Sequence, residues 1–202
     1  MIKLDQTLSP NENLNFYYNK YNKAKRTIEN LHERLPKIEE EVDYLEEIKV
    51  FVNNETDITG LEELENELNI KQKRKIKLYK KIKRDILSYQ YENFTILVGR
   101  NSRENEEITF MKGNGNDIWM HIKDLPGSHV LLLRENRPVP DSVLLYAANL
   151  AGFYSKSGVG DKVTVDYCEK RFVKKIKKSK PGNVTYINYK SIDIIIKDIM
   201  NS

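Results

Sequence analysis

Cysteine is nearly absent from this sequence, since Cys168 is the only one among 202 residues. A single cysteine excludes an internal disulfide and fits a reducing compartment. No apolar run approaches the roughly 18 residues that a membrane-spanning helix needs. The residues from Met1 to Asp5 are not followed by the apolar segment of a secretory signal. We therefore predict a cytoplasmic protein without membrane association.

Basic residues are scarce in the first third of the chain and plentiful afterwards. Residues 1–70 contain 8 lysines and arginines against 16 acidic residues, whereas the remainder contains 26 against 14. The apolar share of 39% is low and the charged share of 32% is high, which suits long solvated helices attached to a modest core. The basic part is expected to attract phosphate backbones.

The first 90 residues have a helical pattern. Apolar residues recur at alternating spacings of three and four from Leu14 to Leu45, which is typical of a coiled coil. Ser9 before Pro10 is a plausible N-cap. The polar stretch 53–57 breaks the pattern, and we expect a second helix from about Asp57 to Gln90. This predicts an antiparallel coiled-coil hairpin over residues 1–90.

From residue 91 to 202 the pattern changes to short strands, turns and two shorter helices. Asn101 with Glu104 resembles a capping box and predicts a helix through Phe110. Asp141 can cap a second helix that runs to about Tyr154. Alternating or continuous apolar stretches predict five or six strands. The expected fold class is α+β, with the helical hairpin followed by a small basic domain.

Residues 117–122 alternate as a strand whose two faces differ in chemistry. The two-residue period places Ile118 and Met120 toward the core, and Trp119 and His121 on the opposite face together with Asp117. An aromatic ring, an imidazole and a carboxylate on one surface could stack on and hydrogen-bond an unpaired base. The alternative is that Trp119 packs under the second of the two shorter helices and His121 caps a turn, because tryptophan is usually buried.

Two other chemistries are weaker. Asp117, His121, Asp124 and His129 could be metal ligands in a hydrolase, but their spacing matches no established zinc pattern. Ser128 next to His129 does not form a nucleophile pair, because adjacent strand residues point to opposite faces. We therefore predict no metal or other cofactor.

Acidic residues are missing from two basic tracts. Residues 71–84 contain nine lysines and arginines, and residues 170–180 contain seven, without a single carboxylate in either. A run of charge is often only a solvated surface, but two acid-free tracts of this density favour a surface that contacts phosphates.

Several motifs resemble a known family. The matching stretches are Ile96–Asn101 with Asn105, Asp117–His121, Pro126–Val130, Ala147–Ala148 through Lys156, Val163–Tyr167 and Lys180–Gly182. They resemble the NFACT-R domain of the family that includes RqcH and NEMF, often labelled fibronectin-binding protein A-like in bacteria. The start of the chain, Leu4–Asp5 with Leu8–Pro10 and Tyr21–Arg26, resembles the middle coiled coil of that family. Gln6 stands where the family usually has proline.

The resemblance implies a role in ribosome-associated quality control. Members bind an obstructed large ribosomal subunit, recruit tRNA and support C-terminal alanine tailing, and this chain would correspond to their C-terminal part. The resemblance also implies that peptide-bond chemistry remains with the ribosome, so we expect no enzyme activity and no catalytic residue in this chain. The expected partners are rRNA, tRNA and a ribosomal protein touching the coiled coil. On physical grounds we predict twelve residues as nucleic-acid contacts: Arg100, Asn101, Trp119, His121, His129, Lys156, Lys170, Arg171, Lys174, Lys175, Lys177 and Lys178. The alternatives are a fibronectin-binding surface adhesin and a coiled-coil scaffold for protein partners.

Overall fold

The helical part of the chain is one long helix followed by a short one. The computed structural model describes residues 3–68, 70, 84–177 and 179–199. Helix α1 spans Pro10–Asn54 and continues through Pro36, and α2 spans Ile58–Glu67. The chain divides into two compact units, Met1–Tyr44 and Leu45–Ser202. Within the described ranges, no helix combines the length and the apolar character that crossing a bilayer requires.

Helix α1 begins at the predicted cap. The backbone N–H of Glu12 donates to Oγ of Ser9 at 3.3 Å, and the backbone N–H of Ser9 donates to Glu12 Oε2 at 2.7 Å. This reciprocal pair is a capping box. Most of the heptad residues of the first unit are exposed, for example Leu14 by 66% and Leu35 by 55%.

The second helix agrees with the prediction only at its beginning. Helix α2 starts at Ile58 but ends at Glu67, and the expected continuation through residues 69 and 71–83 lies outside the described residues. Leu87–Tyr91 forms strand β1 rather than the end of a helix, so that part of the prediction is wrong. Strand β1 also spans residues 90 and 91, where we divided the chain, and that division stays a prediction.

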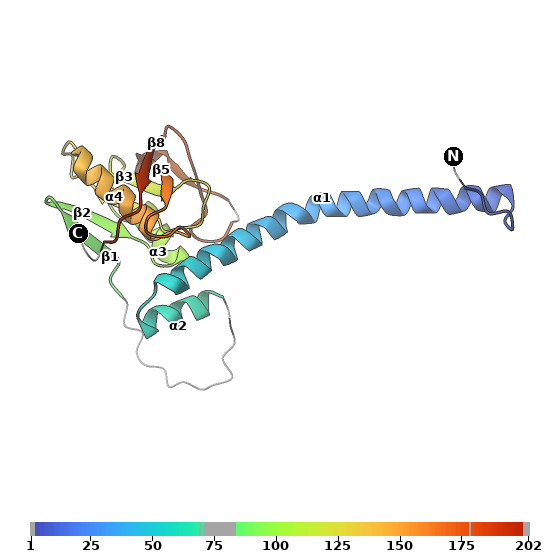
Figure 1. The fold of residues 1–202 in the computed structure, drawn as a ribbon, viewed down its shortest axis with the longest axis horizontal. Coiled ribbons are helices and arrows are strands. Elements are labelled where there is room, and N and C mark those ends of the chain that lie inside the picture. The colour runs from blue at the N-terminus through green and yellow to red at the C-terminus, as the bar shows by residue number, and fades with distance from the viewer. Residues whose placement is uncertain (1–2, 69, 71–83, 178, 200–202) are drawn as a thin grey trace. The chain divides into compact units, whose positions relative to one another are not determined.

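The α+β class is confirmed by an antiparallel sheet in the order β1-β2-β4-β3-β5-β8. After β1 come β2 (Phe94–Val98), α3 (Ser102–Phe110), β3 (Ile118–Ile122), β4 (Val130–Leu133), α4 (Asp141–Phe153), β5 (Lys162–Glu169) and β8 (Lys190–Ile195). Between β5 and β8 the chain forms a 3-10 turn, η1 (Lys170–Phe172), and a separate hairpin of β6 (Val173–Lys175) and β7 (Val184–Tyr186). Figure 1 shows α4 lying across the sheet.

The two faces of the sheet bury different clusters. Helix α4 packs on one face, where Met120, Ile122 and Leu132 belong to a large and mostly aliphatic cluster. The opposite face holds a smaller cluster that includes Trp119 and Ile108 of α3, together with other residues of the sheet and of β6. The predicted alternation of β3 is therefore correct, and both of its faces are covered.

Candidate nucleic-acid interface

Trp119 is enclosed, so the described structure does not offer its ring to a base. The residue has no exposed surface. Its ring centroid lies 6.0 Å from His121, 5.1 Å from His129 and 4.9 Å from Tyr186. This geometry agrees with the alternative prediction, in which Trp119 is packed inside the domain. The covering elements are α3 and the β6–β7 hairpin, however, and not the later helix α4 that we expected.

The two histidines of this face are neutral groups. His129 Nδ1 lies 2.8 Å from Thr109 Oγ1, while that hydroxyl donates to the carbonyl of Asn105 at 2.7 Å. Since the hydroxyl has one proton, Nδ1 carries the hydrogen of the imidazole. Burial holds the pKa of His129 well below its ordinary value, and neighbouring His121 lowers it further. Burial also lowers the pKa of His121. Neither ring supplies positive charge for a phosphate at neutral pH.

The carboxylate of Asp117, which directly precedes β3, has a structural role. Asp117 is 2% exposed, and its two oxygens accept the backbone N–H groups of Arg134 at 2.9 Å and of Asn114 at 2.5 Å. No group of three or more histidine, cysteine or acidic side chains in the part of the chain that the structure describes could hold a metal ion. Of the four residues considered as a metal site, His121 and His129 lie together with ring centroids 5.4 Å apart, but among the described residues no third ligand joins them.

Three predicted RNA contacts are engaged by acidic side chains. Arg100 pairs with Glu104 at 2.8 Å. Asn101 caps α3 by accepting from the backbone N–H of Glu104 at 2.8 Å, as expected from the sequence. Its amide also donates to Glu63 of α2 at 3.4 Å. Lys156 pairs with Glu46 near the end of α1. In this conformation these residues bind carboxylates where RNA phosphates were expected.

Asn105 also binds an acidic side chain, and we did not predict it as an RNA contact. Its Oδ1 accepts the backbone N–H of His129 at 2.9 Å, so its amide N–H₂ must point away, and it donates to Glu47 Oε1 at 3.0 Å. A Cβ at Gly99 would overlap Oδ1 of Asn105, which explains the glycine. Burial raises the pKa of the Glu47 carboxyl to about 8, and the charge of Glu67 adds to the effect.

A cleft between α2 and α3 in the second unit is acidic. Its lining includes four carboxylates, Glu63, Glu67, Glu104 and Glu107, against the two guanidinium groups of Arg84 and Arg103. Arg84 itself is bound to Glu55 at 2.9 Å. The lining that the structure describes carries an excess of negative charge, which does not favour a phosphate.

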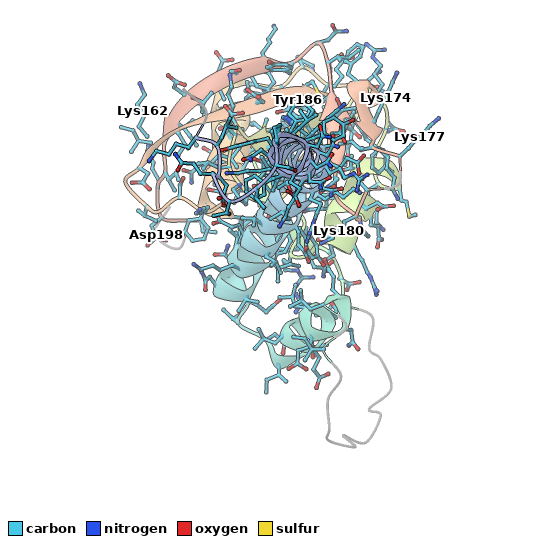
Figure 2. The ribbon with its side chains drawn as sticks, turned by 90° about the vertical axis from the view of Figure 1, so that its right-hand side faces the viewer. Lys162, Lys174, Lys177, Lys180, Tyr186 and Asp198 are labelled. Carbon is cyan, nitrogen blue, oxygen red and sulfur yellow. The ribbon has the colours of Figure 1, made fainter. Side chains whose placement is uncertain are left out.

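The basic tract 170–180 is divided between structural and exposed cations. Lys170 donates to the carbonyl of Lys112, Arg171 pairs with Glu169, and Lys175 pairs with Glu106 at 2.6 Å. Lys174 and Lys177 are exposed and have no ion-pair partner within the described ranges. Figure 2 shows both side chains projecting from the same side of the domain. Lys178, like residues 71–83 of the first tract, lies outside the described residues.

Tyr186 is a residue of this region that sequence reasoning missed. It ends β7 and packs against Trp119, and its hydroxyl donates to the buried carboxylate of Asp166 at 3.0 Å. A strand was expected from Val184 to Tyr189, and the structure forms it over Val184–Tyr186 only. The signal that could have identified it is the position of an aromatic residue on a strand that follows a lysine-rich tract. Contact of any of these residues with RNA stays a prediction.

Comparison with known proteins agrees with the family resemblance. A profile described as the NFACT protein RNA binding domain matches residues 83–188, and one described as the NFACT N-terminal and middle domains matches residues 1–85. The chain is 33% identical over 201 residues to the Rqc2 homolog RqcH of Streptococcus pneumoniae serotype 2, covering 96% of this chain and 36% of that protein. It is 35% identical over 191 residues to the Rqc2 homolog RqcH of Bacillus subtilis, covering 92% and 33%.

A solved structure is similar over most of the chain. It is the C-terminal part of the fibronectin/fibrinogen-binding protein from Streptococcus suis, with a TM-score of 0.77 and 29% identity, covering 93% of this chain and 77% of that one. The chain spans about a third of the length of the curated relatives that it matches. With the RNA-binding profile alone covering more than half of its residues, the chain belongs to the NFACT protein family.

Proposed function

We propose that this chain is the RNA-contacting part of a ribosome-associated quality-control factor. Its partners are obstructed large ribosomal subunits, through rRNA, and tRNA, and its role is to support C-terminal alanine tailing in the cytoplasm. A contact of α1 with a ribosomal protein belongs to the same proposal. Peptide-bond chemistry stays with the ribosome, so the chain binds and positions without catalysing.

The observation that carries the proposal is the pair of exposed lysines on and beside the β6–β7 hairpin. Lys174 and Lys177 lie within the region that matches an RNA-binding domain, and they have no ion-pair partner among the described residues. Lysine side chains of this kind release counterions from a nucleic acid when they bind its phosphates. The relatives named RqcH support the assignment to quality control rather than to adhesion.

The test is the affinity of the purified chain for large ribosomal subunits and for tRNA across a salt series. The double variant Lys174→Glu, Lys177→Glu should weaken binding by at least about tenfold. It should also reduce the slope of log affinity against log salt by about 1.4 to 1.8, because each lost phosphate contact contributes roughly 0.7 to 0.9.

The matched control is Lys162→Glu, Lys197→Glu, which makes the same change in net charge. Lys162 lies on the opposite side of the domain in the view of Figure 2. We expect the control to change affinity and slope much less. Equal losses in the two double variants would show that only the net charge matters. Absence of binding by the unaltered chain at low salt would refute the proposed function.

A further inference from the structure

The loop between β7 and β8 presents an aromatic surface. Tyr189 is 47% exposed, and the neighbouring Ile187 is 54% exposed. The Tyr189 ring meets that of half-buried Tyr186 edge to face, with centroids 5.2 Å apart and planes at 81°. The exposed tyrosine therefore rests on a second ring instead of projecting freely into solvent.

Contacts on its buried side hold Tyr186 in place. Its ring lies 4.9 Å from that of buried Trp119, and its hydroxyl donates to Asp166 Oδ2 at 3.0 Å. The other oxygen of Asp166 accepts the Ser191 hydroxyl at 2.6 Å. Burial and the Asp166 contact raise the pKa of Tyr186, so the phenol stays neutral. A surface fixed before binding loses little side-chain entropy when a ligand arrives.

Cationic side chains flank this aromatic surface. Lys174 is exposed and pairs with Thr185 in the β6–β7 ladder, so its side chain leaves the outer face of the hairpin, next to the pair of Val173 and Tyr186 whose side chains face inward. Lys190 follows Tyr189 in the chain and is also exposed. Figure 2 shows Tyr186 and Lys174 near each other at one edge of the domain. Of the acidic groups here, Asp166 is buried, and Asp124 is exposed and close enough to contribute to the raised pKa of Tyr186.

Exposed aromatic rings among lysines match the chemistry of single-stranded RNA, whose bases stack while its phosphates bind cations. We propose that Tyr189, supported by Tyr186, stacks on an unpaired RNA base while the neighbouring phosphates pass Lys174 and Lys190. The inference rests on the proposed function and deepens it, because it assigns the base-stacking role to these tyrosines in place of the enclosed Trp119.

The experiment compares Tyr189→Ala and Tyr189→Phe with the unaltered chain. The probes are a 12-nucleotide single-stranded RNA, an abasic strand with the same phosphates, and a duplex of the same length. For the single strand, Tyr189→Ala should lose about 5- to 150-fold in affinity, the range measured for one stacked base, with an unchanged salt slope. Tyr189→Phe should bind like the unaltered chain. Neither variant should affect binding of the abasic strand or the duplex.

The matched control is Tyr21→Ala, which removes a tyrosine that is 62% exposed on α1 and should leave affinity unchanged. Thermal melting verifies that each variant is folded. Wild-type affinity of Tyr189→Ala for the single strand, or an equal loss on the abasic strand, would overturn the stacking inference while RNA binding stands. A failure of the unaltered chain to bind the single strand at low salt would overturn the stacking inference. The proposed function falls as well only if the chain also fails to bind large ribosomal subunits and tRNA.

Discussion

The two faces of the six-stranded sheet are built from different chemistry. The face under α4 is a continuous and mostly aliphatic cluster that also includes Phe94. The face under α3 and the β6–β7 hairpin contains a tryptophan, and histidine, asparagine and aspartate side chains oriented by hydrogen bonds lie beside it. The first arrangement provides burial without direction. Burying the polar groups of the second face costs desolvation free energy unless each of them is hydrogen-bonded. Once hydrogen-bonded, they fix the positions of the side chains that lie between the sheet and the lysine-bearing surface.

The largest effect is expected in the aliphatic face. Ile122→Ala removes a fully buried side chain under α4 and should lower the free energy of unfolding by about 2 to 5 kcal/mol. Urea unfolding measures this change in the free energy of unfolding. Ile195→Ala is the control, because that side chain is 61% exposed and its loss should cost less than about 0.5 kcal/mol. The RNA affinity of folded Ile122→Ala should be unchanged. A weaker affinity would mean that the two faces are not separable.

The polar face should respond to the loss of one oriented amide. Asn105→Ala leaves the backbone N–H of His129 and the carboxyl of Glu47 without their partner. We expect a loss of about 1 to 3 kcal/mol in the free energy of unfolding, the penalty for an unpaired buried polar group. Asn149→Ala is the matched control, since its hydrogen bonds to Lys197 are exposed. Equal effects of the two substitutions would argue against a special role for Asn105.

The polar face should also be sensitive to pH. Because the folded pKa of Glu47 is about 8 and its ordinary value is 4.5, the folded chain keeps a proton that the unfolded chain releases. Stability should therefore fall as the pH rises from about 4.5 to 8, by at most about 1.4 kcal/mol per pH unit. Urea unfolding between pH 5 and 9 tests it. The variant Glu47→Gln should remove this dependence, and its persistence would assign the slope to another group.

The smallest effect concerns the half-exposed ion pair of Lys156 with Glu46. Their side chains are 49% and 39% exposed, so the pair should contribute no more than about 1 kcal/mol. Thermal melting of Lys156→Ala, Glu46→Ala and the double variant gives the coupling energy. The two single changes should be nearly additive. A coupling well above 1 kcal/mol would show that this contact belongs with the buried polar network.

The strand faces and helix caps could be predicted because their determinants are local. The alternation of β3 and the Asn101 cap of α3 each depend on a few adjacent residues. The helix at Asp141 was also expected, but the predicted cap is wrong, because Pro140 is the N-cap of α4 and no side chain caps it. Strand β1 could not be predicted, since its apolar residues also fit a continuing helix. Its identity depends on pairing with β2 through a two-residue turn, where Glu92 and Asn93 both have positive φ. Neither residue is glycine, so the usual hairpin signal was missing.

The burial of Trp119 depended on residues far away in the chain. Alternation shows that Trp119 and Met120 lie on opposite faces, but not whether the second face is covered. The cover comes from Ile108, which precedes β3, and from Val173 and Tyr186, which follow it by more than 50 positions. Likewise, the sequence of the lysine tract predicted a positively charged surface. It did not show which lysines, such as Lys175, pair with a carboxylate of the same chain.

The position of Trp119 also gives the protein an optical probe of its own. It is the only tryptophan in the chain, and two imidazoles and the Tyr186 ring surround it. Indole emission shifts with local polarity and is quenched by nearby imidazolium, while a rigid and dry environment keeps it intense and blue. Tyr189 reaches this environment through one intervening ring. A ligand that moves the tyrosines would therefore change the emission spectrum of the unlabelled protein.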